Sequence, residues 1–212
     1  MTEKFDPAHA GKLENPQRLV ELPPENVVAL LDLKGAETVV DYGAGTGLYT
    51  IPVARALTTG RVLAVDEHAE LLEYITAKAA AAGLPPGRLV RVHTRENRVP
   101  LGDGAADRVL LLNVLHHIWD EPAATGEIVR VLAPGGRLVV VDYAQMDRPV
   151  GPSNDHVLSL DQVRAAVAGL GLRELAVHEP GVVGRYQIAV LAEKPAAVAE
   201  AGRGADAGRD AT

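Results

Sequence analysis

Short apolar segments alternate with longer amphipathic segments along most of this chain. The apolar segments are near-continuous runs of valine, leucine and alanine, and they fall at 38–41, 61–66, 88–93, 107–112 and 137–143. The intervening segments with apolar residues at helical spacing are 49–57, 69–82 and 122–132. Apolar strands separated by helices predict a mainly parallel sheet that is covered on both faces.

The last part of the pattern departs from this alternation. We predict a helix at 160–168, with Ser159 as its N-cap. Two strand-like segments, 173–178 and 185–193, then follow one another across a short turn at Pro180-Gly181. Strands joined without a helix pair antiparallel. The predicted fold class is therefore α/β, a Rossmann-like three-layer sandwich with a seven-stranded, mostly parallel sheet and an antiparallel edge hairpin.

Both ends of the chain lack the pattern of the central part. Residues 1–24 are polar and mixed, with a short helix expected within 8–20, and we interpret them as an N-terminal cap segment. Residues 195–212 are rich in alanine and glycine without apolar periodicity, which predicts a disordered tail. A length of 212 residues suits one domain, and we place it at 25–194.

Composition and charge exclude several kinds of chemistry. The chain has no cysteine, which excludes a thiol nucleophile, a cysteine-based zinc site and an iron–sulfur cluster. Its 21 basic and 28 acidic side chains give a formal charge of −7, which disfavours a nucleic acid as partner. No apolar run is long enough for a membrane span, and the first residues lack an apolar signal core. We therefore expect a cytoplasmic protein.

A glycine-rich turn follows the first predicted strand. Residues 39–49 are VVDYGAGTGLY, with glycines at 43, 45 and 47. Glycine permits positive φ and lets a ligand approach the backbone closely, and the N–H groups of the following helix attract acceptors. A dinucleotide fingerprint would place its third glycine where Leu48 stands. Asp66 ends the second strand, where a carboxylate can accept hydrogen bonds from ribose hydroxyls. Together these features predict a ligand that contains a nucleoside.

With these motifs the chain resembles the class I S-adenosylmethionine-dependent methyltransferases, and within them the small-molecule enzymes of the ubiquinone/menaquinone-biosynthesis type. The resemblance spans roughly 25–193, and its motifs are VVDYGAGTG at 39–47, Val65-Asp66, NVLHHI at 113–118 and VLAPGGRL at 131–138. It implies S-adenosyl-L-methionine as cofactor, S-adenosyl-L-homocysteine as product and 25–194 as the methyltransferase domain. Family members often form dimers, so a homodimer remains open.

The resemblance also implies which residues bind the cofactor. The glycine turn and Asp41 would hold its methionine end, Asp66 its ribose, and Asn113 would face the sulfonium. Family members often place an aspartate after the third strand, where it accepts from the adenine amino group. Arg95 occupies that position here and has no acceptor, so Glu96 or backbone groups would have to replace it. The predicted cofactor-binding residues are Asp41, Gly43, Ala44, Gly45, Gly47, Asp66, Glu67, Arg95, Glu96 and Asn113.

Methyl transfer requires a positioned acceptor and, for a hydroxyl or phenol, a general base. His116 and His117 follow the fourth strand, and neighbours on a helix diverge, so one of them is expected to face the site. We favour His116, while a purely structural role for both stays open. His156 in the 144–158 loop and Tyr143 at the end of the fifth strand complete the predicted catalytic set. These histidines and Asp142 lack a diagnostic ligand spacing, so no metal site is predicted.

The sequence thus predicts methyl transfer to oxygen or carbon of a small organic molecule. Few aromatic residues occur, and several of them, such as Tyr42, Tyr49 and Trp119, fall near the predicted site, which favours an apolar or planar substrate. One alternative keeps the cofactor but catalyses cyclisation or decarboxylation, and only Arg95 supports it. A nicotinamide-dependent oxidoreductase is disfavoured by Leu48. A non-catalytic binding protein is disfavoured because the glycine turn and Asp66 are intact.

Overall fold

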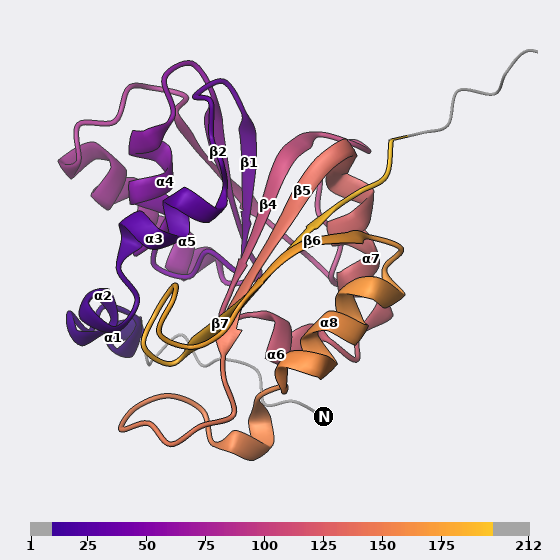
Figure 1. Cartoon of the computed structure of the whole chain (residues 1–212). Helices are drawn as coiled ribbons and strands as arrows, with labels where there is room; N and C mark the ends of the chain where they lie inside the picture. Colours follow the sequence, from indigo (N-terminus) through magenta and orange to yellow (C-terminus); the bar gives the residue numbers. More distant parts are fainter. Residues whose placement is uncertain (1–9, 197–212) are drawn as a thin grey trace, which may run out of the picture.

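A twisted seven-stranded sheet runs through the part of the chain that the computed structural model describes, residues 10–196 (Figure 1). Its strand order is β3-β2-β1-β4-β5-β7-β6. The first five strands along the chain are parallel, and β7 pairs antiparallel with both β5 and β6. The strands are β1 Thr38–Tyr42, β2 Arg61–Asp66, β3 Leu89–His93, β4 Ala106–Leu112, β5 Leu132–Tyr143, β6 Arg173–His178 and β7 Gln187–Glu193. The predicted fold class is confirmed.

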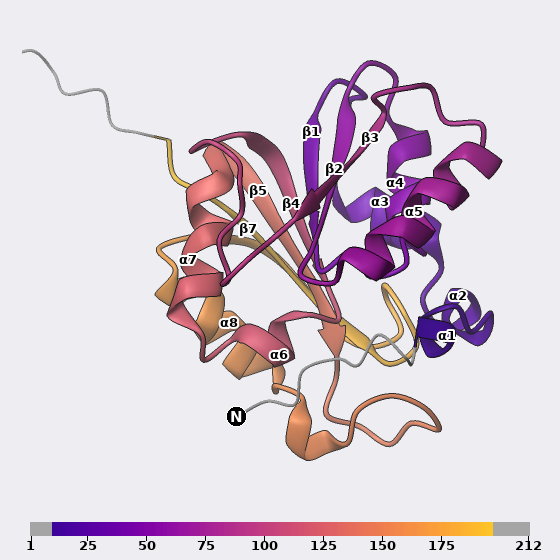
Figure 2. The ribbon, with the colours of Figure 1, turned by 180° about the vertical axis from the view of Figure 1, so that it is seen from behind.

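Helices cover both faces of the sheet, as two opposite views show (Figures 1 and 2). The helices are α1 Ala10–Leu13, α2 Gln17–Glu21, α3 Pro24–Leu30, α4 Thr50–Ala56, α5 Ala69–Ala81, α6 Leu115–Ile118, α7 Pro122–Val131 and α8 Leu160–Gly169, with a short 3-10 helix at Asn154–His156. Helices α3 to α5 pack on one face and α6 to α8 on the other. No helix in residues 10–196 is long and apolar enough to cross a membrane.

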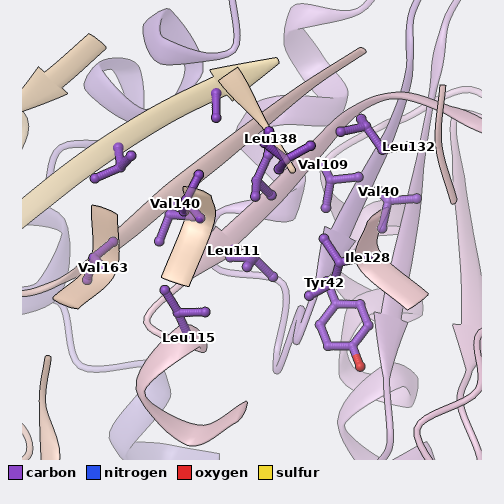
Figure 3. Close-up of a cluster of buried hydrophobic side chains, with 14 of the residues drawn as sticks. Val40, Tyr42, Val109, Leu111, Leu115, Ile128, Leu132, Leu138, Val140 and Val163 are labelled. Carbon is purple, nitrogen blue, oxygen red and sulfur yellow. The ribbon is translucent and has the colours of Figure 1, made fainter. Parts of the chain in front are cut away.

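Alternate residues of the central strands supply two separate apolar cores. Val40 and Val140 point toward α7 and α8 in the cluster of Figure 3, whereas their neighbours Val39 and Val139 pack with α3 and α4. A side-chain period of two places successive strand residues on opposite faces. Because both faces are covered, the strands are almost uninterrupted runs of valine and leucine.

Three local elements differ from the sequence prediction. The single helix expected within 8–20 is two short helices, α1 and α2, and Pro16 lies at the break, where it has no N–H to donate to a continuing helix. Strand β5 begins at Leu132 instead of 137, and its pairing with β4 shifts register between Ala106 and Arg108. Strand β7 begins at Gln187, two residues later than expected. Ser159 does cap α8, where its hydroxyl accepts from the Gln162 N–H.

Several connecting elements gather at the carboxyl end of the parallel strands, at the bottom of Figure 1. Helices α1 and α2, the 144–158 connection and the β6–β7 loop all lie there. The Tyr49 hydroxyl donates to the Leu22 carbonyl oxygen at 3.0 Å, and the Arg185 N–H donates to the Glu21 carbonyl oxygen at 2.6 Å. Loop and core therefore hold α2 from two sides. Phe5 and residues 197–212 lie outside the described residues.

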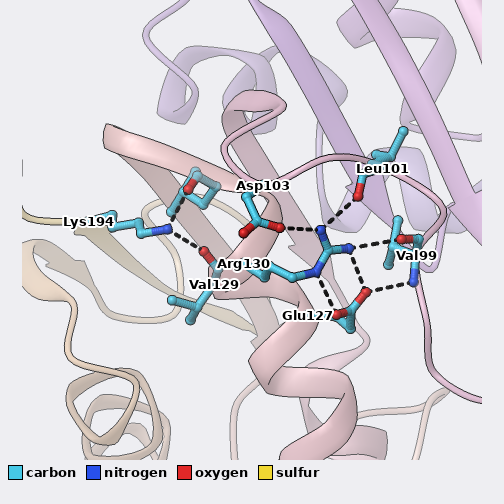
Figure 4. A network of polar contacts seen from close by, with 8 residues as sticks. Val99, Leu101, Asp103, Glu127, Val129, Arg130 and Lys194 are labelled. Atoms are coloured by element: carbon cyan, nitrogen blue, oxygen red, sulfur yellow. Dashed lines mark hydrogen bonds and ion pairs between the residues drawn. The ribbon is translucent and has the colours of Figure 1, made fainter.

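A fully paired polar cluster lies near the opposite, amino-terminal ends of β4 and β5 (Figure 4). The Arg130 guanidinium donates to both carboxylate oxygens of Glu127, at 2.6 and 2.7 Å. Its remaining N–H groups donate to Asp103 at 2.8 Å and to the carbonyl oxygens of Leu101 and Val99 at 2.7 and 2.9 Å. All five N–H donors of this arginine are used. They fix the 99–103 segment against α7.

Candidate active site

A cavity of about 620 Å³ opens at the carboxyl ends of β1, β2, β4 and β5. The glycine turn, the end of β2, helix α6 and residues of α1 and α2 all contribute to its wall. In an open parallel α/β sheet, the crevice outside the carboxyl ends is where ligands bind. Among the predicted site residues, the ones that line it are Asp41, Gly43, Ala44, Gly45, Asp66, Glu67, Asn113, His116, His117 and Tyr143.

The glycine turn is tied to the neighbouring strand by backbone hydrogen bonds. The N–H groups of Gly43 and Ala44 donate to the Val65 carbonyl oxygen at 2.8 and 3.0 Å. Gly43, Gly45 and Gly47 all have positive φ. A Cβ at Gly43 would come within 2.5 Å of Val114, and one at Gly47 within 2.9 Å of Ile75. Gly43 and Gly47 are therefore needed for close packing, and Gly47 is not in the cavity wall.

Asp66 connects the turn to the cavity. One carboxylate oxygen accepts from the Gly45 N–H at 2.8 Å, and the other accepts from the His68 N–H at 2.9 Å. The side chain is 7% exposed and lines the cavity. The His68 Nδ1 also lies 3.1 Å from the oxygen that accepts from the His68 N–H. Because a carboxylate has about four lone-pair sites, Asp66 can still accept from a hydroxyl group of a ligand.

Asp41 places a second carboxyl group in the cavity wall. It is almost fully buried, and the Thr50 hydroxyl donates to it at 2.5 Å. Burial raises its pKa to about 6, although the Thr50 hydrogen bond opposes the shift; the neighbouring charge of Asp66 adds to the rise. A cationic ligand group beside Asp41 would favour the ionised carboxylate.

Two buried polar atoms in the cavity wall have no partner in the described part of the chain. They are the Asn113 Oδ1 and the Thr46 Oγ1. Unpaired buried polar atoms are costly, so such atoms at a cavity indicate contacts that a ligand completes. Five carboxylates line the cavity against two cationic side chains, and these carboxylates are Glu21, Asp41, Asp66, Glu67 and Glu121. This set of donors, acceptors and charge suits a cationic nucleoside with hydroxyl and amino groups.

His116 and Asp142 form a buried pair on the other side of the cavity. The His116 Nδ1 lies 2.6 Å from one carboxylate oxygen of Asp142, and the His116 backbone N–H donates to the other at 3.0 Å. Their side chains are 4% and 3% exposed. Since an ionised carboxylate only accepts hydrogen bonds, Nδ1 carries the proton in a neutral His116. Its Nε2 is then the nitrogen that can accept a proton.

His117 and Tyr143 lie beside this pair and are less suited to take a proton. The rings of His116 and His117 are 4.0 Å apart between centroids. Burial, together with the charge of His116, lowers the pKa of His117 to about 4. Burial raises the pKa of Tyr143, so its hydroxyl stays protonated at neutral pH and can donate. The structure thus brings both histidines to the cavity, where the sequence led us to expect one.

Besides Gly47, three predicted site residues lie outside the cavity wall. Arg95 and Glu96 are exposed and absent from its wall. His156 is also exposed, and its Nδ1 is paired with the Ser153 hydroxyl at 3.1 Å. Asp142 holds His116 and its own neighbour Tyr143, whose N–H donates to it. In residues 10–196 no three histidine, aspartate or glutamate side chains are grouped as metal ligands.

Sequence reasoning missed the residues that close the cavity. Arg18 and Glu21 come from α2, and Gly151 and Pro152 come from the loop after β5. Arg148 folds this loop back on itself by donating to the carbonyl oxygens of Ala144 and Pro152. No motif marks these residues, because tertiary packing alone brings them to the site.

Comparison with known proteins identifies the family. A family model described as a methyltransferase domain matches residues 40–140. A SAM-dependent methyltransferase from Aquifex aeolicus has a similar structure, with a TM-score of 0.82 and 30% identity over 90% of this chain and 99% of that one. The fold and the cavity already define a Rossmann-like protein with a nucleoside-sized site. The chain belongs to the S-adenosylmethionine-dependent methyltransferases.

Curated relatives agree with this placement. An uncharacterized methyltransferase of Mycobacterium bovis is 40% identical over 121 residues, which cover 56% of this chain and 44% of the relative. The ubiquinone/menaquinone biosynthesis C-methyltransferase UbiE of Syntrophotalea carbinolica is 28% identical over 120 residues, or 57% of this chain and 49% of the relative. The chain therefore spans less than half of the length of these relatives. The cofactor of the family is S-adenosyl-L-methionine, as the sequence predicted.

Proposed function

We propose that this protein transfers a methyl group from S-adenosyl-L-methionine to oxygen or carbon of a small, apolar or planar organic molecule. The observation that carries the proposal is one continuous cavity that joins the glycine turn and Asp66 to His116 and Tyr143. A cofactor site and a proton-accepting group on one cavity are what an assisted methyl transfer requires.

The cofactor side of the proposal uses the acidic wall. Asp66 would accept from the ribose hydroxyls, Asp41 would balance the cationic methionine end, and Asn113, with its unpaired Oδ1, would hold the sulfonium side of the cofactor. When bound, S-adenosyl-L-methionine supplies an electrophilic methyl group. Everything else that the reaction needs is positioning, charge complementarity and a path for the acceptor's proton.

His116 takes that proton in the proposed mechanism. Asp142 holds the Nδ1 side of the ring, which leaves Nε2 as the base and stabilises the imidazolium that forms. Asp142 is a positioning residue, since its carboxylate contacts His116 and the backbone. Tyr143 keeps its proton and orients the acceptor by donating a hydrogen bond.

The substrate class follows from the rest of the wall. Leu13, Leu48, Leu112 and Val150 supply apolar surface, and Tyr49 adds an aromatic ring. Such a wall supports an apolar or planar acceptor. Of the other aromatics that the sequence placed near the site, Tyr42 also lines the cavity, whereas Trp119 does not.

Two measurements, made one after the other, test the proposal. Calorimetry with S-adenosyl-L-methionine, S-adenosyl-L-homocysteine and NAD first establishes the cofactor, and we expect micromolar binding of the two sulfur nucleosides only. Methyl transfer is then assayed across a panel of phenols, quinols and amines, with mass spectrometry of the products. Failure to bind either sulfur nucleoside would overturn the proposal. Tight cofactor binding with conversion but no methylation of any acceptor would favour a non-methylating reaction on the same cofactor.

A further inference from the structure

A tight turn after β3 decides which side chains of residues 94–97 face the cavity and which face solvent. The Arg98 N–H donates to the Arg95 carbonyl oxygen at 2.9 Å, and Glu96 and Asn97 have φ of 51° and 60°. Two central residues with positive φ are typical of a type I′ turn, and asparagine tolerates this conformation well. The turn leaves Arg95 and Glu96 exposed, whereas Thr94 and Asn97 line the cavity.

The side-chain amide of Asn97 has a fixed orientation. Its Nδ2 donates to the Glu121 Oε2 at 3.0 Å, and Glu121 is the residue that precedes α7. An ionised carboxylate cannot donate a hydrogen bond, so the amide must turn its NH2 group toward Glu121. The Asn97 Oδ1 accepts no hydrogen bond from residues 10–196. Asn97 therefore presents an acceptor at a cavity wall.

This acceptor lies where the base of a bound nucleoside would be. Asp66 ends β2, and β3 is the next strand away from β1 and the glycine turn. The Thr94 N–H donates to the Asp66 carbonyl oxygen at 2.9 Å, so the turn begins directly beside the ribose-binding residue. Leu71 and Ile118 line the same cavity and supply apolar surface for a planar ring.

We propose that the Asn97 Oδ1 accepts a hydrogen bond from the exocyclic amino group of the cofactor's adenine. Glu121 is the positioning residue that keeps the Asn97 amide in this orientation. The inference rests on the proposed cofactor site and deepens it. It also accounts for Arg95: the position where relatives often carry an aspartate faces solvent here, and Asn97, two residues later, replaces its function.

The preference for a 6-amino over a 6-oxo purine tests directly which end of the Asn97 amide faces the ligand. The two ligands are S-adenosyl-L-homocysteine and its deaminated form, S-inosyl-L-homocysteine, and calorimetry measures both dissociation constants on each protein. In the wild type we expect the amino form to bind at least about tenfold more tightly, because a 6-oxo group would face another acceptor. A ratio of two constants on one protein is insensitive to small differences in stability.

Two variants should lower this ratio, each for a different reason. Asn97→Gly keeps the positive φ of the turn and removes the acceptor. Glu121→Gln replaces a pure acceptor by an amide that also donates, so the Asn97 amide can rotate and present its NH2 group to a 6-oxo purine. We expect the ratio to fall to about threefold or less in both. Glu96→Gln, in the same turn but outside the cavity, is the matched control and should keep the wild-type ratio.

A double variant separates positioning from a structural role. In Asn97→Asp/Glu121→Gln the carboxylate at position 97 only accepts and the amide at position 121 donates to it, so selectivity for the amino form should return to within about twofold of the wild type. A ratio near one in the wild type, an unchanged ratio in Asn97→Gly, or no recovery in the double variant would each overturn the inference. Absence of binding of both nucleosides to the wild type would instead overturn the proposed function.

Discussion

The two ends of the sheet differ in how their polar side chains are paired, with half-buried groups at one end and buried groups at the other. At the amino-terminal end, Arg130 has a partner for every N–H group, and the carboxylate of Glu127 also accepts from the Val99 N–H at 2.8 Å (Figure 4). At the carboxyl end, Asn113 and Thr46 each leave a buried oxygen without a partner in the described part of the chain. Paired groups rigidify a fold, whereas unpaired groups cost stability. The Arg130 cluster at the amino-terminal end therefore serves the fold, whereas Asn113 and Thr46 at the carboxyl end keep oxygens for a ligand.

The largest expected effect is the loss of His116, the proposed base at the cavity end. His116→Asn keeps an N–H group close to the place of Nδ1, so Asp142 retains its partner while Nε2 is removed. We expect the rate of methyl transfer to fall by about 10² to 10⁴-fold with cofactor affinity nearly unchanged. Single-turnover kinetics and calorimetry measure the two quantities. His156→Asn, at an exposed histidine outside the cavity, is the control, and equal losses in both variants would remove His116 from the mechanism.

Disrupting the Arg130 cluster should lower the stability of the fold and leave the cofactor site unchanged. Arg130→Met leaves Glu127 and Asp103 without their cation and the 99–103 segment without its anchor. Because the cluster is only half-buried, we expect the free energy of unfolding to fall by about 1–3 kcal/mol, measured by urea titration. Cofactor affinity of the folded protein should stay within about twofold. A strong loss of affinity at equal folded fraction would show that the two ends are coupled.

Asp66→Ala tests the cavity carboxylate that contacts the ribose in our proposal. The lost hydrogen bonds should weaken cofactor binding by about 1–3 kcal/mol in calorimetry. Asp107→Ala is a matched control, since the Asp107 carboxylate also accepts from a backbone N–H, that of Thr38 at 2.9 Å, but lies outside the cavity. It should reduce stability without changing affinity. Unchanged affinity in Asp66→Ala would show that the ribose lies elsewhere.

The pH dependence of stability should differ in sign between the two ends. Arg130 lowers the pKa of Glu127 from 4.5 to about 2, so its contribution is present above pH 4.5 and is lost as the pH falls toward 2. Burial raises the pKa of Asp41 from 3.8 to about 6, so the folded state is favoured below pH 3.8 and loses that advantage as the pH rises through 6. Urea titrations between pH 3 and 8 measure the free energy of unfolding. Glu127→Gln should remove its decrease at acid pH, and Asp41→Asn should remove its decrease between pH 4 and 6. The same pH profile in both variants would contradict this difference between the two ends.

The smallest effect is expected at an unpaired atom itself. Asn113 has a φ of 56°, which glycine adopts without strain, so Asn113→Gly removes the unpaired Oδ1 and leaves the backbone unchanged. We expect the stability of the ligand-free protein to change by less than about 1 kcal/mol, while cofactor affinity falls about three- to tenfold. A large loss of stability in thermal unfolding would mean that Asn113 serves the fold.

The parts of the site that the sequence predicted lie at, or next to, the end of a strand. Asp41, Asp66, Asn113 and Tyr143 follow from the alternation of strands and helices, because parallel strands bring their carboxyl ends to one edge. The strands themselves were predictable because both faces of the sheet are covered, so their residues are apolar without interruption. This local signal extends to His116 and His117, which lie in the short helix α6 after β4.

The remaining site residues depend on geometry that no local pattern encodes. Asn97 lines the cavity, and not Arg95 or Glu96, because two consecutive residues with positive φ reverse the chain there. Arg18 and Glu21 reach the cavity only because α2 is held by Tyr49 and the β6–β7 loop. His156 shows the converse: its place in a loop after β5 suggested the site, and the path of that loop carries it to the surface.

The position of β7 has a consequence for how the protein is made. It is the last strand of the sheet along the chain, yet it lies between β5 and β6 and pairs with both. Until the ribosome has released residues 187–193, the edge of β5 next to Tyr143 exposes unpaired backbone groups, and β6 has no partner strand. Exposed strand edges of this kind invite aggregation. The sheet can therefore be completed during synthesis only when β7 is available. A premature stop before position 187 would leave an aggregation-prone fragment.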